Sequence, residues 1–245
     1  SRNIQKLFYN GEGLIYTYKS FLDYKGGSMS VIVIAAIFFL LLFVVIEYGK
    51  RRFDLQAEVS RKLVHIGAAV MSAALPLVMN FEQIIIIGIL FLGFLLISKQ
   101  VNLFPSIHGV KRKTYGEIYF PIAVSLMAYF FPSNLLYMHG LLIMGFSDGL
   151  AGLSGQHYGT RKYVILSKQK SYVGSGAFLF SAWLISFISL LISGANPMPA
   201  LLLGLLLGIT VTGVEASLTT GLDNLVVPLV ASTALLQCLY FLGLR

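Results

Sequence analysis

Long stretches without a charged side chain constrain this chain more than any other feature. Lysine, arginine, aspartate and glutamate are absent from residues 31–46, 63–81, 83–98, 118–147, 171–214 and 224–244. An α-helix needs about 20 apolar residues to cross about 30 Å of hydrocarbon. Charged residues make up only 11% of the 245 residues and the mean hydropathy is +0.81, which excludes an ordinary soluble domain.

The two longest uncharged stretches must each be divided. A Gly-Ala-Asn-Pro sequence at 194–197 interrupts 171–214, and a Pro-Ser-Asn sequence at 132–134 interrupts 118–147. The second half of 118–147 is short, so we expect its helix to continue past Asp148. The sequence therefore predicts an all-α, polytopic integral membrane protein with about eight transmembrane helices, or alternatively seven.

Residues 1–28 are considered apart from residues 29–245. They end in Gly-Gly-Ser just before Met29, which is typical of an appended linker followed by a native start. The alternative is an amphipathic helix in the membrane interface, because apolar residues such as Ile4, Leu7 and Phe8 share one helix face. In both cases we expect residues 29–245 to form a single multi-pass transmembrane domain.

The basic residues are distributed unevenly between the expected loops. With helices counted from residue 29 onward, loops 1–2, 3–4 and 5–6 contain thirteen lysines and arginines, whereas loops 2–3, 4–5 and 6–7 contain none. Basic loops remain on the cytoplasmic side of a membrane, so we expect loops 1–2, 3–4, 5–6 and 7–8 to be cytoplasmic. The net charge of +8 then favours an anionic leaflet or anionic substrates, and no nucleic-acid partner is expected.

Asp148 is the most informative single polar residue. Asp148, Gly152, Gly155 and Gly159 follow one another at spacings of four, three and four, so they line one face of one helix. Glycines remove side chains from that face and let another group approach the backbone beside a carboxylate. Tight packing of small residues is the alternative interpretation, but it leaves an ionisable group at the membrane edge unexplained.

Acidic and basic side chains gather at the same expected membrane edge from separate loops. Asp148, Glu215 and Asp223 are candidate ligands for Mg²⁺, which prefers carboxylate, water and phosphate oxygens. Phosphoryl transfer needs mainly positioning and charge stabilisation of this kind. The alternatives are that basic residues at helix ends only snorkel and that Asp223 is a helix N-cap. The candidates for binding a polyphosphate are Arg61, Lys62, Arg161, Lys162 and Lys170.

Five motifs, taken in order, resemble the CTP-dependent polyprenol kinase family, and its phytol-kinase-like branch most closely. The resemblance covers residues from about 50 to 240. Two departures bear on the substrate more than on the reaction: Ser171 stands where relatives often carry threonine, and Gln-His-Tyr at 156–158 is unusual. The motifs are Arg61-Lys62-x-x-His65, Thr-Tyr-Gly-Glu-Ile-Tyr-Phe-Pro at 114–121, Asp148-Gly149-x-Ala151-Gly152-x-x-Gly155-x-x-x-Gly159, Lys170-Ser171-x-x-Gly174-Ser175 and Glu215-x7-Asp223-Asn224-x3-Pro228.

The resemblance implies a transmembrane kinase domain over residues 29–245. Such a kinase transfers the γ-phosphoryl group of a nucleoside triphosphate, typically CTP, with Mg²⁺ or another divalent cation. The acceptor is a membrane-dissolved isoprenoid alcohol such as phytol, farnesol, geranylgeraniol or a longer polyprenol. The implied catalytic residues are Asp148, Lys170, Glu215 and Asp223. The implied nucleotide-binding or phosphate-binding residues are Arg61, Lys62, His65, Lys113, Gly152, Gly155, Gly159, Arg161, Lys162 and Asn224.

Two other functions remain as alternatives at this stage. A CTP:phosphatidate cytidylyltransferase has a similar acidic residue and glycine stretch, but its late His-Gly-Gly and Asp-Arg-x-Asp elements are missing here. A transporter usually places its polar site near the bilayer midplane, whereas the charges in this sequence lie at one edge. The oligomeric state is left open.

Overall fold

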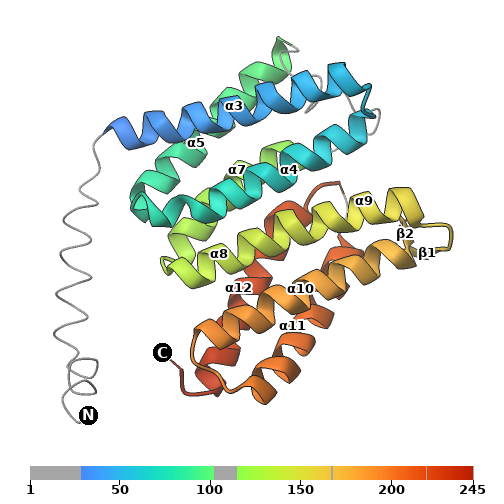
Figure 1. Cartoon of the computed structure of the whole chain (residues 1–245). Coiled ribbons are helices and arrows are strands. Elements are labelled where there is room, and N and C mark those ends of the chain that lie inside the picture. Colours follow the sequence, from blue (N-terminus) through green and yellow to red (C-terminus); the bar gives the residue numbers. More distant parts are fainter. Residues whose placement is uncertain (1–28, 102–114, 167, 219, 245) are drawn as a thin grey trace.

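Helices form nearly all of the regular structure in residues 29–101, 115–166, 168–218 and 220–244, which the computed structural model describes (Figure 1). One two-stranded hairpin completes the described elements. The elements are α3 (Met29–Phe53), α4 (Ala57–Ala74), the 3₁₀ turn η1 (Leu75–Leu77), α5 (Phe81–Gln100), α7 (Gly116–Phe130), α8 (Asn134–Leu142), the π-helical turn η2 (Ile143–Ser147), α9 (Asp148–Tyr158), β1 (Lys162–Ile165), β2 (Lys168–Ser171), α10 (Tyr172–Ile192), α11 (Pro197–Ser217) and α12 (Asp223–Phe241).

Five described helices are long and apolar enough to cross a membrane: α3, α5, α10, α11 and α12. Helix α7 is a shorter apolar helix. Their outer faces expose large apolar side chains, such as Ile34 and Phe38 on α3 and Leu202 and Leu206 on α11. A bilayer accommodates this exposure, whereas water does not. The prediction of a helical multi-pass membrane protein is therefore confirmed, and the count of eight spans stays a prediction.

Helices α8 and α9 form one continuous rod through the π-helical turn η2. This rod begins after the turn at residues 131–133 and carries Asp148 in its interior, as the sequence predicts. Gly145 lies in η2, where an added Cβ atom would be 1.8 Å from the Cβ atom of Ala69. The missing side chain therefore lets α4 pack closely against the turn. Such π-helical turns are rare and often adjoin functional residues.

Two local features differ from what the uncharged stretches indicate. The loop before α10 contains the antiparallel pair β1–β2, in which Tyr163 lies opposite Lys170. Helix α4 occupies Ala57–Ala74, earlier than the stretch 63–81. The helix ends before Pro76, because proline interrupts the helical hydrogen bonds. Its first turns carry charged side chains, which are stable in the polar membrane interface outside the hydrocarbon.

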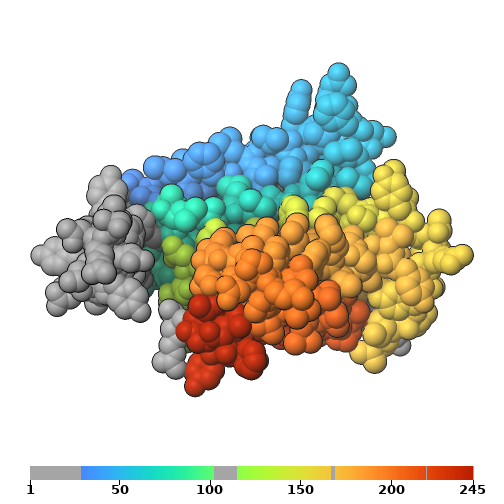
Figure 2. Space-filling view, turned by 60° about the horizontal axis from the view of Figure 1, so that its bottom comes forward, coloured from blue at the N-terminus to red at the C-terminus, as the bar shows by residue number. Residues whose placement is uncertain are grey.

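Helices α10 and α11 are neighbours in sequence and pack closely side by side (Figure 1). Gly204 lies against the backbone of Phe187, and Gly208 lies against that of Trp183. A Cβ atom added to Gly204 would be 3.0 Å from the Phe187 nitrogen, and one added to Gly208 would be 3.1 Å from the Trp183 nitrogen. Small residues allow this close approach of helices. The tight pair brings the end of α11 back to the start of α10 and to the β-hairpin. Figure 2 shows the hairpin region, in yellow, at the opposite end of the bundle from the red C-terminal residues.

Candidate active site

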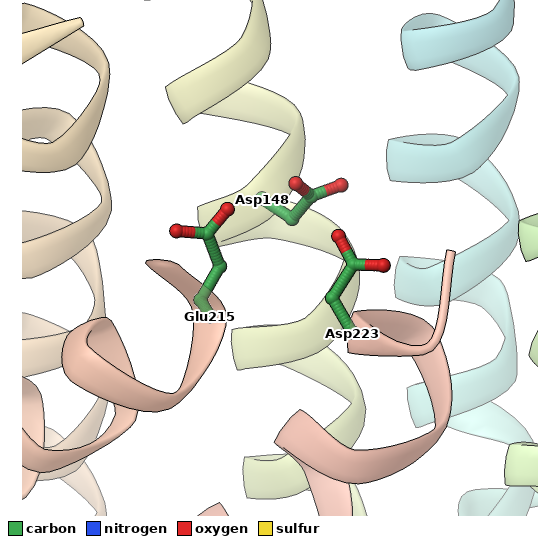
Figure 3. Close-up of side chains that lie close together, drawn as sticks. All are labelled: Asp148, Glu215 and Asp223. Carbon is green, nitrogen blue, oxygen red and sulfur yellow. The ribbon is translucent and has the colours of Figure 1, made fainter. Parts of the chain in front are cut away.

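Three carboxylates from three separate helical segments converge (Figure 3). Asp148 lies within the continuous rod of α8 and α9, Glu215 lies in the last turn of α11, and Asp223 begins α12. One oxygen atom from each carboxylate can be chosen so that all three lie within 4.8 Å of one another. The three side chains predicted to bind a metal ion therefore form one group. Carboxylate oxygens at such separations are suited to a hard divalent cation.

Asp148 is held by two side chains of α4. The Nζ atom of Lys62 donates to Oδ2 of Asp148 at 2.6 Å and to its backbone oxygen at 3.2 Å. The Nε2 atom of His65 lies 3.4 Å from the same Oδ2 atom. The Lys62 ammonium group therefore compensates the charge of this largely buried carboxylate.

Lys170 and Glu215 form a second ion pair within this group. The hairpin positions Lys170 on β2, and the packing of α11 against α10 brings Glu215 to it. The next residue, Ser171, caps α10 by accepting a hydrogen bond from the Gly174 amide at 3.0 Å. The exposed fraction of Glu215 is only 4%. A buried carboxylate requires a cationic partner of this kind.

Asp223 differs from the other two carboxylates because its Oδ1 atom is buried without a hydrogen-bond partner among the described residues. The preceding turn is unusual, because Thr220 and Gly221 have φ angles of 59° and 90°. A β-branched residue with positive φ is strained. Two hydrogen bonds hold this turn in place. The backbone oxygen of Thr220 accepts from the Tyr115 amide at 3.0 Å, and Nδ2 of Asn224 donates to the backbone oxygen of Gly116 at 3.0 Å.

These groups surround a polar cavity with a volume of about 350 Å³. We call it the carboxylate cavity. Its lining residues are Glu58, Arg61, Lys62, Gly116, Asp148, Ala151, Gly152, Gly155, Lys162, Gln169, Lys170, Ser171, Gly174, Ser175, Glu215, Thr220, Gly221, Asp223 and Asn224.

Most of the described site residues predicted from the sequence line this cavity, but three of them do not. His65 lies behind Asp148 and lines a neighbouring cavity. Gly159 is packed against Ser171, and Arg161 is exposed, with its backbone oxygen accepting from the Tyr172 amide. Lys113, which was also predicted to bind phosphate, lies outside the described residues.

The glycines of α9 accommodate groups of the protein itself. An added Cβ atom on Gly152 would lie 2.4 Å from Cε of Lys62, and one on Gly155 would lie 2.6 Å from Oγ of Ser171. The open helix face predicted from the sequence is thus partly filled by the Lys62 side chain and the start of α10. Close packing and an accessible carboxylate are combined here, so the two interpretations of the glycines do not exclude each other.

Several cavity residues were not singled out from the sequence. Glu58 pairs with Arg61 at 2.5 Å, and the spacing of three residues on a helix is a signal that indicates this contact. Ser175 belongs to the Lys-Ser-x-x-Gly-Ser motif, and its Oγ atom is 2.6 Å from the Tyr163 hydroxyl oxygen. Thr220 had no comparable signal, because its backbone conformation is imposed by the turn between α11 and α12.

The arrangement is chemically suited to binding a polyphosphate with a divalent cation. The three carboxylates supply hard oxygen ligands, and the unpartnered Oδ1 atom of Asp223 fits a cation. Lys62 and Lys170 bring two ammonium groups to the same cavity, where each now faces a carboxylate. Ammonium groups in this position also neutralise phosphate oxygens.

Comparison with characterised proteins gives one relative. The chain is 31% identical over 177 residues to the phytol kinase of Synechocystis sp., and the match covers 71% of this chain and 76% of that protein. No family model matches the chain. No solved structure matches it either.

Proposed function

Because this chain belongs to the phytol-kinase-like polyprenol kinase family, we propose that it transfers the γ-phosphoryl group of a nucleoside triphosphate to the hydroxyl group of an isoprenoid alcohol. The observation that carries the proposal is the convergence of three carboxylates and two lysines in the carboxylate cavity. An apolar cavity adjoins it. A water-soluble donor and a lipid acceptor would thus have separate, neighbouring places.

Asp148, Glu215 and Asp223 are the proposed ligands of Mg²⁺ or another divalent cation. When bound, the cation neutralises charge on the β- and γ-phosphates. Lys62 and Lys170 would then contact phosphate oxygens in addition to their present carboxylate partners. Arg61, Lys162 and Asn224 line the same cavity and are proposed to contact the nucleotide from its margin.

The reaction exchanges one phosphorus–oxygen bond for another. The hydroxyl oxygen of the alcohol bonds to the γ-phosphorus, while the bond from that phosphorus to the β,γ-bridging oxygen breaks. A nucleoside diphosphate leaves, and the hydroxyl proton passes to a carboxylate of the cluster. Lys62 and Lys170 stabilise charge on the transferring group, which is the main task of a phosphoryl-transfer site.

CTP is the proposed donor, on the basis of the five sequence motifs. Phytol, farnesol, geranylgeraniol and longer polyprenols are the proposed acceptors. The donor is tested with the purified chain in lipid vesicles, where unlabelled CTP, UTP and ATP compete against γ-labelled CTP. Preference for CTP predicts that unlabelled CTP suppresses the labelled product more strongly than an equal amount of ATP.

The phosphorus atom of CTP that ends up in the lipid product distinguishes this proposal from its alternatives. With γ-labelled CTP, Mg²⁺ and an isoprenoid alcohol, we expect label in an organic-soluble prenyl monophosphate, and none from α-labelled CTP. Label from the α position with release of pyrophosphate would instead identify a cytidylyltransferase that acts on a lipid phosphate. Lipid movement across vesicles without nucleotide hydrolysis would identify a transporter.

A further inference from the structure

A second cavity, of about 60 Å³, lies directly beside the carboxylate cavity. Arg61, Gly116 and Asn224 line both cavities, so the two meet at these residues. The second cavity is otherwise mostly apolar. Its apolar lining consists of Phe43, Val64, Ala68, Phe91, Leu95 and Phe120.

A third cavity, of about 10 Å³, continues from the second, because Phe91 and Phe120 line both. On α4, the residues Arg61, His65 and Ala68 line the second cavity and Ser72 lines the third. Their spacings of four, three and four place them on one helix face. From Arg61 to Ser72 this face extends about 16 Å along the helix axis. The second and third cavities therefore form a row that leads away from the carboxylates.

We propose that the hydrocarbon tail of the acceptor alcohol lies in this row, which we call the tail channel and define by Ala68, Ser72, Phe91 and Phe120. The proposal rests on the proposed function and adds the place where its lipid substrate binds. An isoprenoid alcohol has one polar end and a branched apolar chain. The row likewise opens into a polar cavity at one end and has an apolar wall beyond it.

The polar end of the tail channel places a hydroxyl group beside the reacting groups. His65 lines the channel, and its Nε2 atom is 3.4 Å from Oδ2 of Asp148 and 3.3 Å from the Met144 oxygen. Because a carbonyl oxygen can only accept, the Nε2 atom donates to it. A hydroxyl group at the junction, where Arg61 and Asn224 line both cavities, lies beside the carboxylate cavity that Asp148 lines.

Phe91 has to move when the tail enters. The two apolar cavities are each smaller than an isoprenoid chain, and Phe91 lines both. Its half-buried ring lies 5.2 Å from the ring of Phe39 and 5.6 Å from that of Phe43, measured between centroids. In the proposed complex, Phe91 adopts another staggered rotamer, and the two cavities that it now separates join into one channel.

If the tail lies in this channel, Ser72 limits the length of acceptor that fits. Ser72 is 1% exposed and lines the third cavity, which is the one distal to the carboxylates. The test compares geraniol with geranylgeraniol as acceptors for the full chain in lipid vesicles with γ-labelled CTP. We expect Ser72→Phe to lower kcat/KM for geranylgeraniol by at least about tenfold. Turnover of geraniol, whose shorter chain ends before the third cavity, should change by less than about twofold.

Val70→Phe is the matched control, because Val70 is on the same helix but 44% exposed on the outer face. It should affect neither alcohol. Equal losses for both alcohols in a folded Ser72→Phe variant, or no loss for either, would overturn the channel. If the wild-type chain phosphorylates no alcohol at all, the proposed function fails instead.

A second measurement covers the case in which Ser72→Phe does not fold. A geranylgeraniol analogue with a diazirine at the end of its tail is photolysed with the wild-type chain, and the labelled peptides are identified. Labelling of α4 at Ser72 or of α5 at Ile87, which both line the distal cavity, supports the channel. Labelling confined to outward-facing positions such as Val70 contradicts it.

Discussion

The carboxylate cavity and the tail channel share a boundary but have opposite linings. In the carboxylate cavity, Lys62 faces Asp148 and Lys170 faces Glu215. The channel has a wall of aromatic and aliphatic side chains that includes Phe91 and Phe120. In our proposal, charge arrangement controls the reaction in the first region, whereas shape controls the choice of acceptor in the second. Substitutions in the two regions should therefore change different kinetic quantities.

The largest effect is expected for Asp148→Asn. This change removes a proposed cation ligand and the charge that Lys62 faces, so kcat/KM should fall at least about 100-fold, equivalent to about 2.7 kcal/mol. The ratio of rates for long and short alcohols should stay unchanged, because the channel wall is intact. Steady-state kinetics with both alcohols measures the two quantities.

Glu82→Gln is the control for Asp148→Asn. Glu82 is an exposed acid in the first turn of α5 and does not line any of the three cavities described above. Its substitution should leave kcat/KM within about twofold of wild type. Near-normal turnover by Asp148→Asn would place the reacting charges elsewhere and would remove the contrast between the two regions.

A smaller effect is expected for Asp223→Asn, which tests whether the buried Oδ1 atom belongs to a cation site. Loss of a ligand should raise the Mg²⁺ concentration needed for half-maximal activity by at least about tenfold. Binding of Mn²⁺ to the purified chain, followed by electron paramagnetic resonance without nucleotide, should weaken in parallel. Unchanged Mn²⁺ binding would show that Asp223 acts only as a helix N-terminal residue.

Lys162 and Lys170 of the hairpin offer a matched pair with different burial. Lys170 is half-buried and faces Glu215, whereas Lys162 is exposed on β1. Lys170→Gln should raise the KM for CTP by about tenfold or more, because Glu215 is left without its partner. Lys162→Gln should raise it only about twofold, as for a solvent-exposed charge. Equal effects would mean that burial does not distinguish the two contacts.

The last test measures cysteine labelling rather than activity, and it addresses the side of the membrane on which the loops lie. In a Cys238→Ser background, a cysteine at Lys162 in the hairpin should react with an impermeant reagent only from the cytoplasmic side. A cysteine at Asn134, at the start of α8, should react only from the other side. External labelling at Lys162 in intact cells would contradict the predicted orientation of the loops.

Local sequence signals anticipated much of the helical framework and the composition of the site. Uncharged stretches indicated the apolar helices, and the breaks near Pro132 and Pro197 were correctly located. The spacing of Asp148 and the glycines predicted a helix that carries an acid at one edge. The β-hairpin was not predicted, because its four-residue strands are too short and polar to show a clear periodic pattern.

The sequence by itself determined a membrane-embedded helical protein with acids and bases at one end, because hydropathy, proline and glycine act over a few residues. Only the tertiary structure decided which charges meet. Lys62 and Asp148 are 86 positions apart, and Lys170 and Glu215 are 45 positions apart. Their contacts depend on Gly145 and Gly152, which let α4 approach the rod of α8 and α9, and on the close pairing of α10 with α11. The two apolar cavities likewise occur only where faces of α3, α4, α5 and α7 pack imperfectly together, and no local pattern specifies such a gap.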